Sequence, residues 1–294
     1  MLLGARVDPC EPPYCELRKF LCFWISSCVG HSVVFGFVSQ KLRDRRNFPV
    51  IAEQGANVSA QYRNNPTTLD TLLSEFGPTR VQRFQADVEH EDQVSSLFTQ
   101  ASKAFGPIQI IIVNHGYWPT EDVPVSRMSL QQWNSTISTD LTSCFLVCRE
   151  FLRNLEDADD AVKDQISIVL IGSTAGKYGE GFHADYAASK SALMYGLTLS
   201  LKNEIVHIAP KGRVNSIAPG WVYTPMAAES LKDPDVVYQS LATTPLKKFA
   251  QPEDIASQIV LVSSSKVSGH VTGQVIMVEG GMEGRLLNKP SDLA

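Results

Sequence analysis

The chain has 294 residues, a formal net charge of −5 and a pI near 5.7. The excess of acidic residues argues against a nucleic-acid partner, because such partners are bound through basic surfaces. Hydrophobic residues make up 44% of the sequence, which is ordinary for a globular chain with a sizeable core. The length suits one large domain or two small ones.

The six cysteines do not form a metal-binding pattern. None belongs to a C-x-x-C pair, and no cluster of histidines accompanies them. We therefore predict no metal site, and we expect unpaired thiols in a reducing cytoplasm. Four lie near the start of the chain and two in a helical pattern: Cys10, Cys15, Cys22, Cys28, Cys144 and Cys148.

The beginning of the chain is irregular, and we interpret residues 1–30 as an extension without a fold of its own. Residues 20–40 carry no Asp, Glu, Lys or Arg and reach the ~20 residues that a bilayer span needs, so they suggest a membrane anchor. Polar residues in the middle of this stretch argue against an anchor, and residues 32–38 also suit a buried parallel strand. We therefore expect a cytoplasmic protein folded over residues 31–294, with membrane anchoring as the alternative.

From Gly55 onward, strand patterns alternate with helix patterns. This alternation implies a doubly wound α/β fold, a parallel sheet of Rossmann type with helices on both faces, in a single domain. Ligands bind beyond the carboxyl ends of the strands in such sheets. The acidic segment 156–164 is predicted to be a solvated loop. We predict strands over residues 56–62, 81–87, 108–114, 166–171, 213–217 and 271–278, and helices over residues 67–76, 92–105, 133–155, 186–205 and 252–262.

Two of these helices have an apolar stripe that we expect to face the sheet. In helix 92–105 the stripe consists of Val94, Leu97, Phe98 and Ala101, and in helix 133–155 it consists of Ile137, Leu141, Phe145, Cys148 and Leu152.

Tyr186 and Lys190 are candidate catalytic residues. They stand four apart, so on a helix they share one face. A phenol titrates near pKa ~10, and an ammonium one turn away favours the phenolate and lowers that pKa. A tyrosine tuned in this way can pass a proton to or from an alcohol or carbonyl oxygen. Ser173 follows a buried strand and carries a hydroxyl that can hold the same oxygen, so the three residues fit carbonyl reduction or alcohol oxidation.

With this Ser…Tyr-x-x-x-Lys arrangement the chain resembles the short-chain dehydrogenase/reductase family, from about Gly55 to about Met282. The branch it is most similar to is that of the 3-oxoacyl-carrier-protein reductases. The resemblance implies that Lys190 also binds the ribose of a nicotinamide cofactor. It further implies a homodimer or homotetramer formed through the helices 133–155 and 186–205.

Further segments resemble the cofactor-binding motifs of the family. Asp87-Val88 is similar to the acidic position that holds the adenine, and Asn114-His115-Gly116 to the Asn-Ala-Gly turn. Pro219-Gly220-Trp221-Val222-Tyr223-Thr224 resembles the Pro-Gly-x-x-x-Thr segment at the nicotinamide end. The cofactor-binding residues that the resemblance implies are Asp87, Val88, Asn114, Gly116, Tyr186, Lys190, Pro219, Gly220, Val222 and Thr224.

Arg63 favours NADP(H) as the cofactor. It follows the second predicted strand, where the adenosine ribose is expected, and no carboxylate accompanies it there. A carboxylate at that point accepts from a ribose 2′-hydroxyl, whereas arginine suits a 2′-phosphate. The other interpretation is that Arg63 is a solvated loop residue.

Two positions depart from the family pattern. Asp140 stands where the family usually has an asparagine that seats a water for proton relay to the lysine, so we expect a slower relay. The glycine-rich turn that holds the pyrophosphate is expected near residues 37–44, where this chain has no glycine. We therefore regard the first strand–turn–helix unit, residues 31–54, as degenerate.

These observations predict an oxidoreductase that transfers a hydride between NADP(H) and a ketone or secondary alcohol, with Ser173, Tyr186, Lys190 and Asp140 as the catalytic residues. The first alternative is a non-catalytic relative that has lost dinucleotide binding together with the glycine turn. The second is a membrane-tethered reductase anchored by residues 20–40. The partners we expect are a small carbonyl or alcohol substrate and further copies of the chain.

Overall fold

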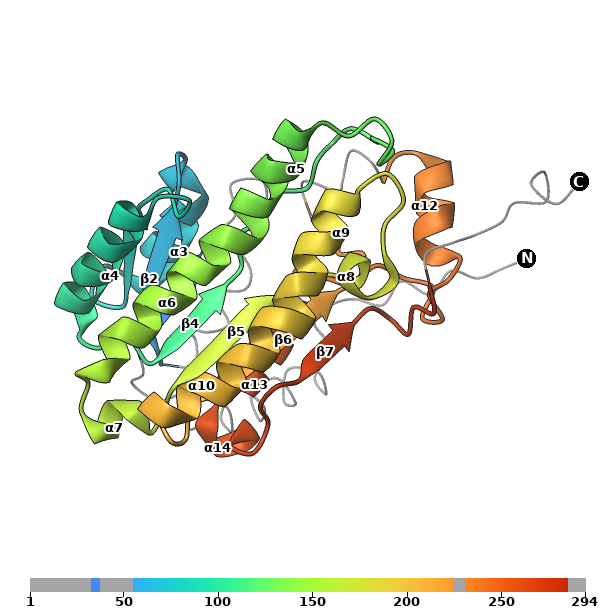
Figure 1. Ribbon diagram of the computed structural model, residues 1–294. Helices are drawn as coiled ribbons and strands as arrows, with labels where there is room; N and C mark the ends of the chain where they lie inside the picture. Colours follow the sequence, from blue (N-terminus) through green and yellow to red (C-terminus); the bar gives the residue numbers. More distant parts are fainter. Residues whose placement is uncertain (1–32, 38–54, 225–230, 285–294) are drawn as a thin grey trace, which may run out of the picture.

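The computed structural model describes residues 33–37, 55–224 and 231–284, the first of these ranges by its backbone. Within them, parallel strands form one sheet in the order β3-β2-β1-β4-β5-β6-β7, which confirms the predicted doubly wound α/β fold (Figure 1). The strands are β1 (Val33–Phe37), β2 (Asn57–Tyr62), β3 (Val81–Gln85), β4 (Ile110–Val113), β5 (Ser167–Ile171), β6 (Arg213–Pro219) and β7 (Val275–Val278).

Strand β1 occupies the middle of the sheet. It pairs in parallel with β2 on one side, where Val33 faces Asn57, and with β4 on the other, where Val34 faces Ile110. The chain therefore proceeds outward from β1 to β3 and then crosses back to β4. Such a reversal of strand order opens a crevice at the carboxyl ends of the two strands, which is where doubly wound sheets bind ligands.

Helices cover both faces of the sheet. The first face carries α4 (Glu91–Phe105) and two long helices, each with a π-helical turn in the middle. These are α5–η2–α6 (Leu130–Ile137, Ser138–Thr142, Ser143–Glu156) and α9–η3–α10 (Ala184–Ser191, Ala192–Leu197, Thr198–Ile208). The second face carries η1 (Pro66–Leu69), α3 (Asp70–Phe76) and α13 (Pro252–Ser263). Shorter helices are α7 (Asp160–Lys163), α8 (Thr174–Tyr178), α12 (Pro234–Leu241) and α14 (Ser265–Ser268).

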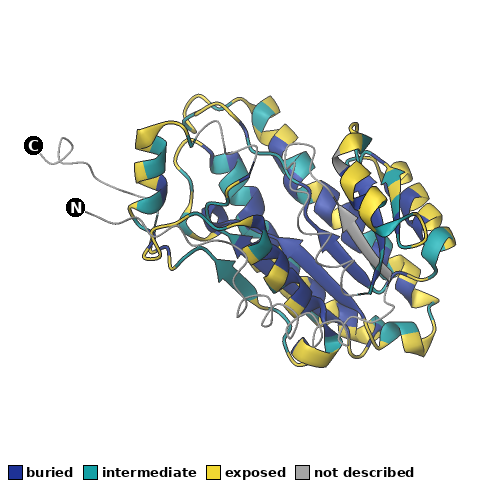
Figure 2. Cartoon of the chain, turned by 180° about the vertical axis from the view of Figure 1, so that it is seen from behind, coloured by how far each residue is buried: buried dark blue, intermediate teal, exposed yellow. Residues whose placement is uncertain are grey.

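The sheet separates two hydrophobic cores, visible as the dark interior in Figure 2. Successive side chains of a strand point to opposite faces, so within β4 Ile111 joins the first core while Ile110 and Ile112 join the second. Phe98 of α4 and Phe151 of α6 pack together in the first core with ring centroids 6.4 Å apart. These cores fix the strands whose ends carry the polar site.

The apolar stripe predicted for helix 92–105 is confirmed, and the one predicted for helix 133–155 is confirmed in part, since Cys148 is buried and Leu141 and Leu152 pack against the first core. Phe145 of that second stripe is 44% exposed. The buried face of α6 also includes Cys144, Val147, Phe151 and Leu155, which the predicted stripe left out. Helical periodicity identifies the apolar side of a helix, but it does not decide how deeply each residue on it is buried against the sheet.

Two predicted boundaries also change. The segment expected to be a solvated loop, residues 156–164, contains the one-turn helix α7 (Asp160–Lys163). The last strand begins at Val275 rather than at residue 271. Before it, Thr272 Oγ1 accepts from the Val214 N–H, and the Gln274 N–H donates to the Asn215 side chain, so these residues contact β6 through side-chain hydrogen bonds. Neither change moves a candidate site residue.

Several predictions fall outside the described residues. The extension 1–30 and the expected glycine-turn segment 38–44 lie there, as does most of the candidate anchor 20–40. Residues 33–37 of that candidate anchor form β1, a strand of the sheet. In the part of the chain that the structure describes, no helix has the length and apolar character to cross a membrane.

Candidate active site

The predicted site residues gather at one edge of the sheet. Arg63 follows β2, Asp87 lies just beyond β3, and Asn114 follows β4 directly. Ser173 lies two residues beyond β5, and Gly220 follows β6. Since all strands run parallel, these positions share the carboxyl edge that the topology marks for a ligand.

Lys190 lies buried at the centre of this edge. Both Tyr186 and Lys190 belong to α9, as the spacing predicted, and the Lys190 Nζ lies 5.7 Å from the centroid of the Tyr186 ring. The ammonium donates to the carbonyl oxygen of Ile171 at the end of β5, at 3.1 Å. This hydrogen bond fixes the helix that carries the tyrosine to the strand that precedes Ser173.

The charge of Lys190 is maintained although the side chain is only 4% exposed. Burial alone lowers the pKa of an ammonium, but the negative charges that Tyr186 and Asp140 can carry outweigh burial here and raise the pKa of Lys190 above its usual value. Lys190 is therefore an ammonium at neutral pH, which is the form that favours a tyrosine phenolate.

Asp140 lies in the π-helical turn η2 and is fully buried. Its Oδ1 accepts from the backbone N–H of Tyr117 at 2.5 Å, and its Oδ2 has no hydrogen-bond partner among the described residues. Burial raises the pKa of this carboxyl to about 6, against the opposing effects of Lys190 and the Tyr117 N–H. The pKa of the Asp140 carboxyl therefore lies close to neutrality.

Gly116 brings Asp140 and Lys190 close to the same point. A Cβ at Gly116 would lie 3.3 Å from Lys190 Nζ and 3.4 Å from Asp140 Oδ1. The first distance is tighter than nine in ten real Cβ contacts and the second is at the edge of ordinary van der Waals contact, so a side chain here requires Lys190 to shift by a few tenths of an ångström. This close approach explains the glycine at the end of the Asn114-His115-Gly116 turn.

Ser173 caps the short helix α8 and is 8% exposed. Its Oγ accepts a hydrogen bond from the backbone N–H of Ala175 at 3.1 Å. The hydroxyl hydrogen remains available to donate, because accepting this bond uses only a lone pair. The cap fixes the hydroxyl at the same sheet edge as Tyr186.

His115 has a structural role beneath the site. The Ser143 hydroxyl donates its hydrogen to the carbonyl oxygen of Thr139 at 2.5 Å. His115 Nε2 lies 2.6 Å from the same hydroxyl oxygen, so Nε2 carries a hydrogen and donates it to that oxygen. Burial and, to a lesser extent, the charge of Lys190 lower the pKa of His115 to about 3. The ring is therefore neutral and holds the start of α6 to the end of β4.

Sequence reasoning missed two residues that hold Tyr186. Asp185 is fully buried; its Oδ2 accepts from Thr136 Oγ1 at 2.7 Å, and its Oδ1 accepts from the Tyr186 N–H at 2.9 Å. Trp118 packs edge-on against the Tyr186 ring with centroids 4.7 Å apart. An Asp directly before the candidate tyrosine was a visible signal, but its partner on α5 becomes a neighbour only in the tertiary structure.

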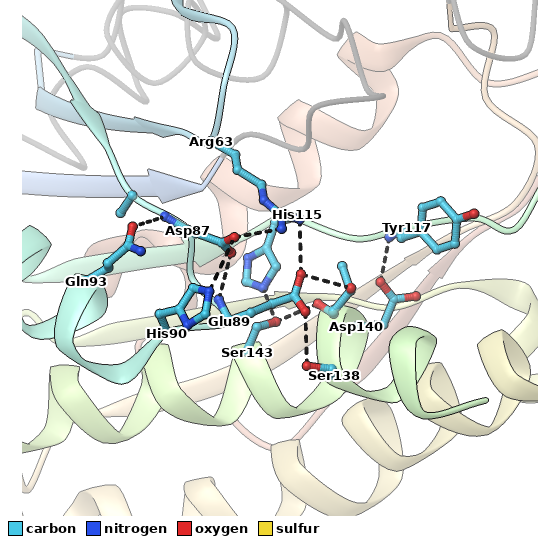
Figure 3. Close-up of polar contacts among 12 residues, drawn as sticks. Arg63, Asp87, Glu89, His90, Gln93, His115, Tyr117, Ser138, Asp140 and Ser143 are labelled. Carbon is cyan, nitrogen blue, oxygen red and sulfur yellow. Dashed lines mark hydrogen bonds and ion pairs between the residues drawn. The ribbon is translucent and has the colours of Figure 1, made fainter. Parts of the chain in front are cut away.

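Arg63 does not stand alone at the end of β2. Its guanidinium forms ion pairs with Asp87 Oδ2 at 2.6 Å and with Glu89 Oε1 at 3.1 Å (Figure 3). With its side chain 42% exposed, Arg63 combines these ion pairs with contact to solvent, and both interpretations of this residue stay predictions. Val88, between the two carboxylates, is buried.

The residues after β6 form a separate part of the same edge. The N–H of Gly220 donates to the carbonyl oxygen of Val278 at 3.0 Å, and a Cβ at Gly220 would lie 3.0 Å from the Cα of Glu279. Val222 forms an isolated bridge with Ala250, and Thr224 is buried. The close packing of Gly220 fixes the direction in which Pro219 and the residues after it leave the strand.

The residues present fit a dinucleotide at the Lys190 end of the site. An ammonium carries three hydrogen-bond donors. Among the described residues, Lys190 donates one of them to the carbonyl oxygen of Ile171. The remaining donors suit the hydroxyls of a ribose beside Tyr186. The expected pyrophosphate-binding segment, residues 38–44, lies outside the described residues.

Comparison with known proteins agrees with this arrangement. A family model described as Enoyl-(Acyl carrier protein) reductase matches residues 50–283. The 3-oxoacyl-[acyl-carrier-protein] reductase FabG of Staphylococcus epidermidis is 31% identical over 239 residues, covering 79% of this chain and 91% of its own length. FabG of Chlamydia trachomatis is 33% identical over 235 residues, covering 79% of this chain and 90% of its own.

Solved structures agree as well. A short-chain dehydrogenase/reductase from Brucella melitensis, titled glucose/ribitol dehydrogenase, superposes with a TM-score of 0.75 at 30% identity, covering 86% of this chain and 98% of its own. The protein gox2181 superposes with a TM-score of 0.77 at 22% identity, covering 88% and 98%, and so supports the fold alone.

We predict that Asp140 makes stability fall with pH. Its folded pKa of about 6 lies above the ordinary value of 3.8, so the folded state keeps the proton longer than the unfolded state. The free energy of unfolding therefore decreases as pH rises through this window, by about 3 kcal/mol in total. Asp140→Asn removes this loss and is expected to be more stable than the wild type at pH 8, with the difference vanishing toward pH 4.

Urea denaturation between pH 4 and pH 8 measures this effect, with Asp164→Asn as the control. Asp164 is half exposed and pairs with Lys211 on the surface. Asp164→Asn therefore removes one negative charge, as Asp140→Asn does, but from a position that is not buried. A stability difference for Asp140→Asn that does not change with pH would contradict the assignment.

Proposed function

The chain belongs to the short-chain dehydrogenase/reductase family of oxidoreductases, and from this premise we propose that it transfers a hydride between NADP(H) and a ketone or secondary alcohol. The observation that carries the proposal is the buried Lys190 ammonium 5.7 Å from the Tyr186 ring. The FabG relatives suggest the ketone of a 3-oxoacyl thioester as the first substrate to test.

NADP(H), when bound, supplies or accepts the hydride. In the reducing direction Tyr186 protonates the forming alkoxide. The positive charge of Lys190 then stabilises the phenolate that Tyr186 becomes. Ser173 donates to the substrate oxygen and holds it near the tyrosine. Lys190 also donates to the nicotinamide ribose, and the Asp140 carboxylate, where the family usually has an asparagine, holds the Lys190 ammonium and slows proton relay to it. Oxidation of the alcohol uses the same groups in reverse.

The remaining candidate residues bind the cofactor in this proposal. Arg63 supports NADP(H) over NAD(H), since it is the cation at the end of β2 and its side chain is 42% exposed. Asp87 and Val88 hold the adenine, Asn114 and Gly116 shape the floor of the crevice, and the segment after β6 takes the nicotinamide end. That segment contributes Pro219, Gly220, Val222 and Thr224.

We further propose that the chain forms a homodimer or homotetramer through α5–α6 and α9–α10. These helices lie side by side on the outer surface of the molecule (Figure 1). They expose large apolar side chains, among them Phe145 at 44%, Tyr195 at 42% and Leu199 at 36%. A second copy of the chain would remove this apolar surface from water.

A second candidate function is that of a non-catalytic relative. Residues 37–44 contain no glycine, although a glycine-rich turn lets the backbone approach a pyrophosphate. In this interpretation the sheet and the Tyr186–Lys190 pair persist without dinucleotide binding. Nucleotide binding discriminates the two candidates.

The first prediction is that the purified full chain binds NADPH in the micromolar range and NADH more weakly, measured by nucleotide fluorescence. Tyr186→Phe should then bind NADPH normally and reduce a 3-oxoacyl thioester at least ~100-fold more slowly, because it lacks the proton donor. Tyr195→Phe, on the exposed side of η3, serves as the control. A folded chain that binds neither nucleotide would establish the non-catalytic alternative.

The second prediction concerns proton relay. The Asp140 carboxylate holds the Lys190 ammonium more tightly than a neutral amide does, so Asp140→Asn should raise kcat above pH 6. Below pH 6 the carboxyl is protonated and the two enzymes should converge. Steady-state rates between pH 5 and pH 8 test this, and a kcat ratio of one throughout would contradict it.

The third prediction is that the wild type elutes in gel filtration with light scattering at a multiple of the chain mass of 32.3 kDa. The pair of substitutions Phe145→Asp and Tyr195→Asp should shift it to the monomer, since charge on the contact face opposes burial. Tyr238→Asp, 53% exposed on α12, is the control and should leave the mass unchanged. A monomeric wild type would refute the proposed assembly.

A further inference from the structure

Two carboxylates share the one guanidinium at the ends of β2 and β3. Arg63 Nη2 lies 2.6 Å from Asp87 Oδ2, and its Nη1 lies 3.1 Å from Glu89 Oε1 (Figure 3). The guanidinium is thus oriented toward β3 and η2 by a carboxylate on each of its two terminal nitrogens. Residue 89 was not among the positions that the family motifs pointed to.

Glu89 is held in place from a second side. Its Oε2 accepts from the Ser138 hydroxyl at 3.0 Å, and its Oε1 accepts from the Thr139 hydroxyl at 3.2 Å. The N–H of Glu89 also donates to Asp87 Oδ1 at 3.1 Å. The Glu89 side chain is 21% exposed against 42% for Arg63, so the carboxylate is the fixed member of the pair and the guanidinium is drawn to it.

The charges in this cluster oppose a phosphate. Arg63 contributes one positive charge, and Asp87 and Glu89 contribute two negative charges. His90 Nε2, 3.9 Å from Asp87 Oδ2, adds a positive charge only when it is protonated. A 2′-phosphate would bring further negative charge to a cluster that is already negative when His90 is neutral, and it would have to share the guanidinium with both carboxylates.

We propose that Glu89 is a specificity-determining residue that restrains Arg63 and thereby weakens the preference of the site for NADP(H) over NAD(H). This inference rests on the proposed function, because it assigns Arg63 to the 2′-phosphate. Glu89 acts through Arg63, as a positioning residue, and makes no contact with the reacting atoms. The ratio of the affinities for NADP(H) and NAD(H) is accordingly smaller than it would be if Arg63 were not paired with Glu89.

Glu89→Gln tests the proposal with little structural change. The amide keeps an oxygen that accepts from Ser138 or Thr139, but it loses the charge that competes for the guanidinium. At low ionic strength we expect the Kd for NADPH to fall about 3- to 10-fold. The Kd for NADH, which has no 2′-phosphate, should stay unchanged. Asp164→Asn removes an equal charge from a surface ion pair beside α7 and should change neither constant.

A second pair of variants shows whether Arg63 mediates the effect. In the Arg63→Ala background, Glu89→Gln should tighten NADPH binding clearly less than it does when the arginine is present. An equal gain in both backgrounds would overturn the assignment of Glu89 as a residue that acts through Arg63. Thermal unfolding of each variant verifies that the fold is retained.

The outcomes separate this inference from the proposed function. A wild type that binds NADPH, together with a Glu89→Gln variant whose NADPH affinity is unchanged or weaker, overturns the inference alone. A wild type that binds neither nucleotide overturns the proposed function and the inference together. A selective gain for NADPH over NADH supports both.

Discussion

The buried ammonium of Lys190 is the interaction on which the rest of the site depends. Its hydrogen bond to the Ile171 carbonyl joins α9 to the end of β5, and its charge is balanced by the buried Asp140 and the partly buried Tyr186. Burying a charge is costly unless it is paired and hydrogen-bonded. The site meets this condition with Asp140 and Tyr186, so the candidate catalytic groups and the packing of two long helices are parts of one electrostatic arrangement.

The π-helical turn η2 links this centre to the distant end of the crevice. Asp140 in the turn lies beneath Lys190, while Ser138 and Thr139 of the same turn hold Glu89. Because Glu89 in turn holds Arg63, one turn of helix contacts both the proton-transfer groups and the cluster that we assign to the 2′-phosphate. Burial raises the pKa of Asp140 first of all, with a smaller contribution from the charge of Glu89.

Tyr186, the candidate proton donor, is held by residues outside the Ser…Tyr-x-x-x-Lys motif. Asp185 fixes the backbone of Tyr186 through hydrogen bonds that reach α5, and Trp118 packs against its ring. The first contact orients the backbone of Tyr186, and the second packs one side of its ring. Preorganisation of this kind is what allows a proton donor to act without reordering during the reaction.

The sequence by itself determined the strand–helix alternation, the parallel sheet and the positions of Ser173, Tyr186 and Lys190, because periodicity and short spacings are local properties of a chain. Only the tertiary structure decided which apolar residues of α6 pack deepest against the sheet, because Phe145 lies 44% exposed while Phe151 and Leu155 are buried. It alone also paired Arg63 with Glu89 and Asp185 with Thr136, which are 26 and 49 residues apart. Such partners meet because strands and helices distant along the chain end at the same edge of the sheet, and no local pattern encodes that meeting.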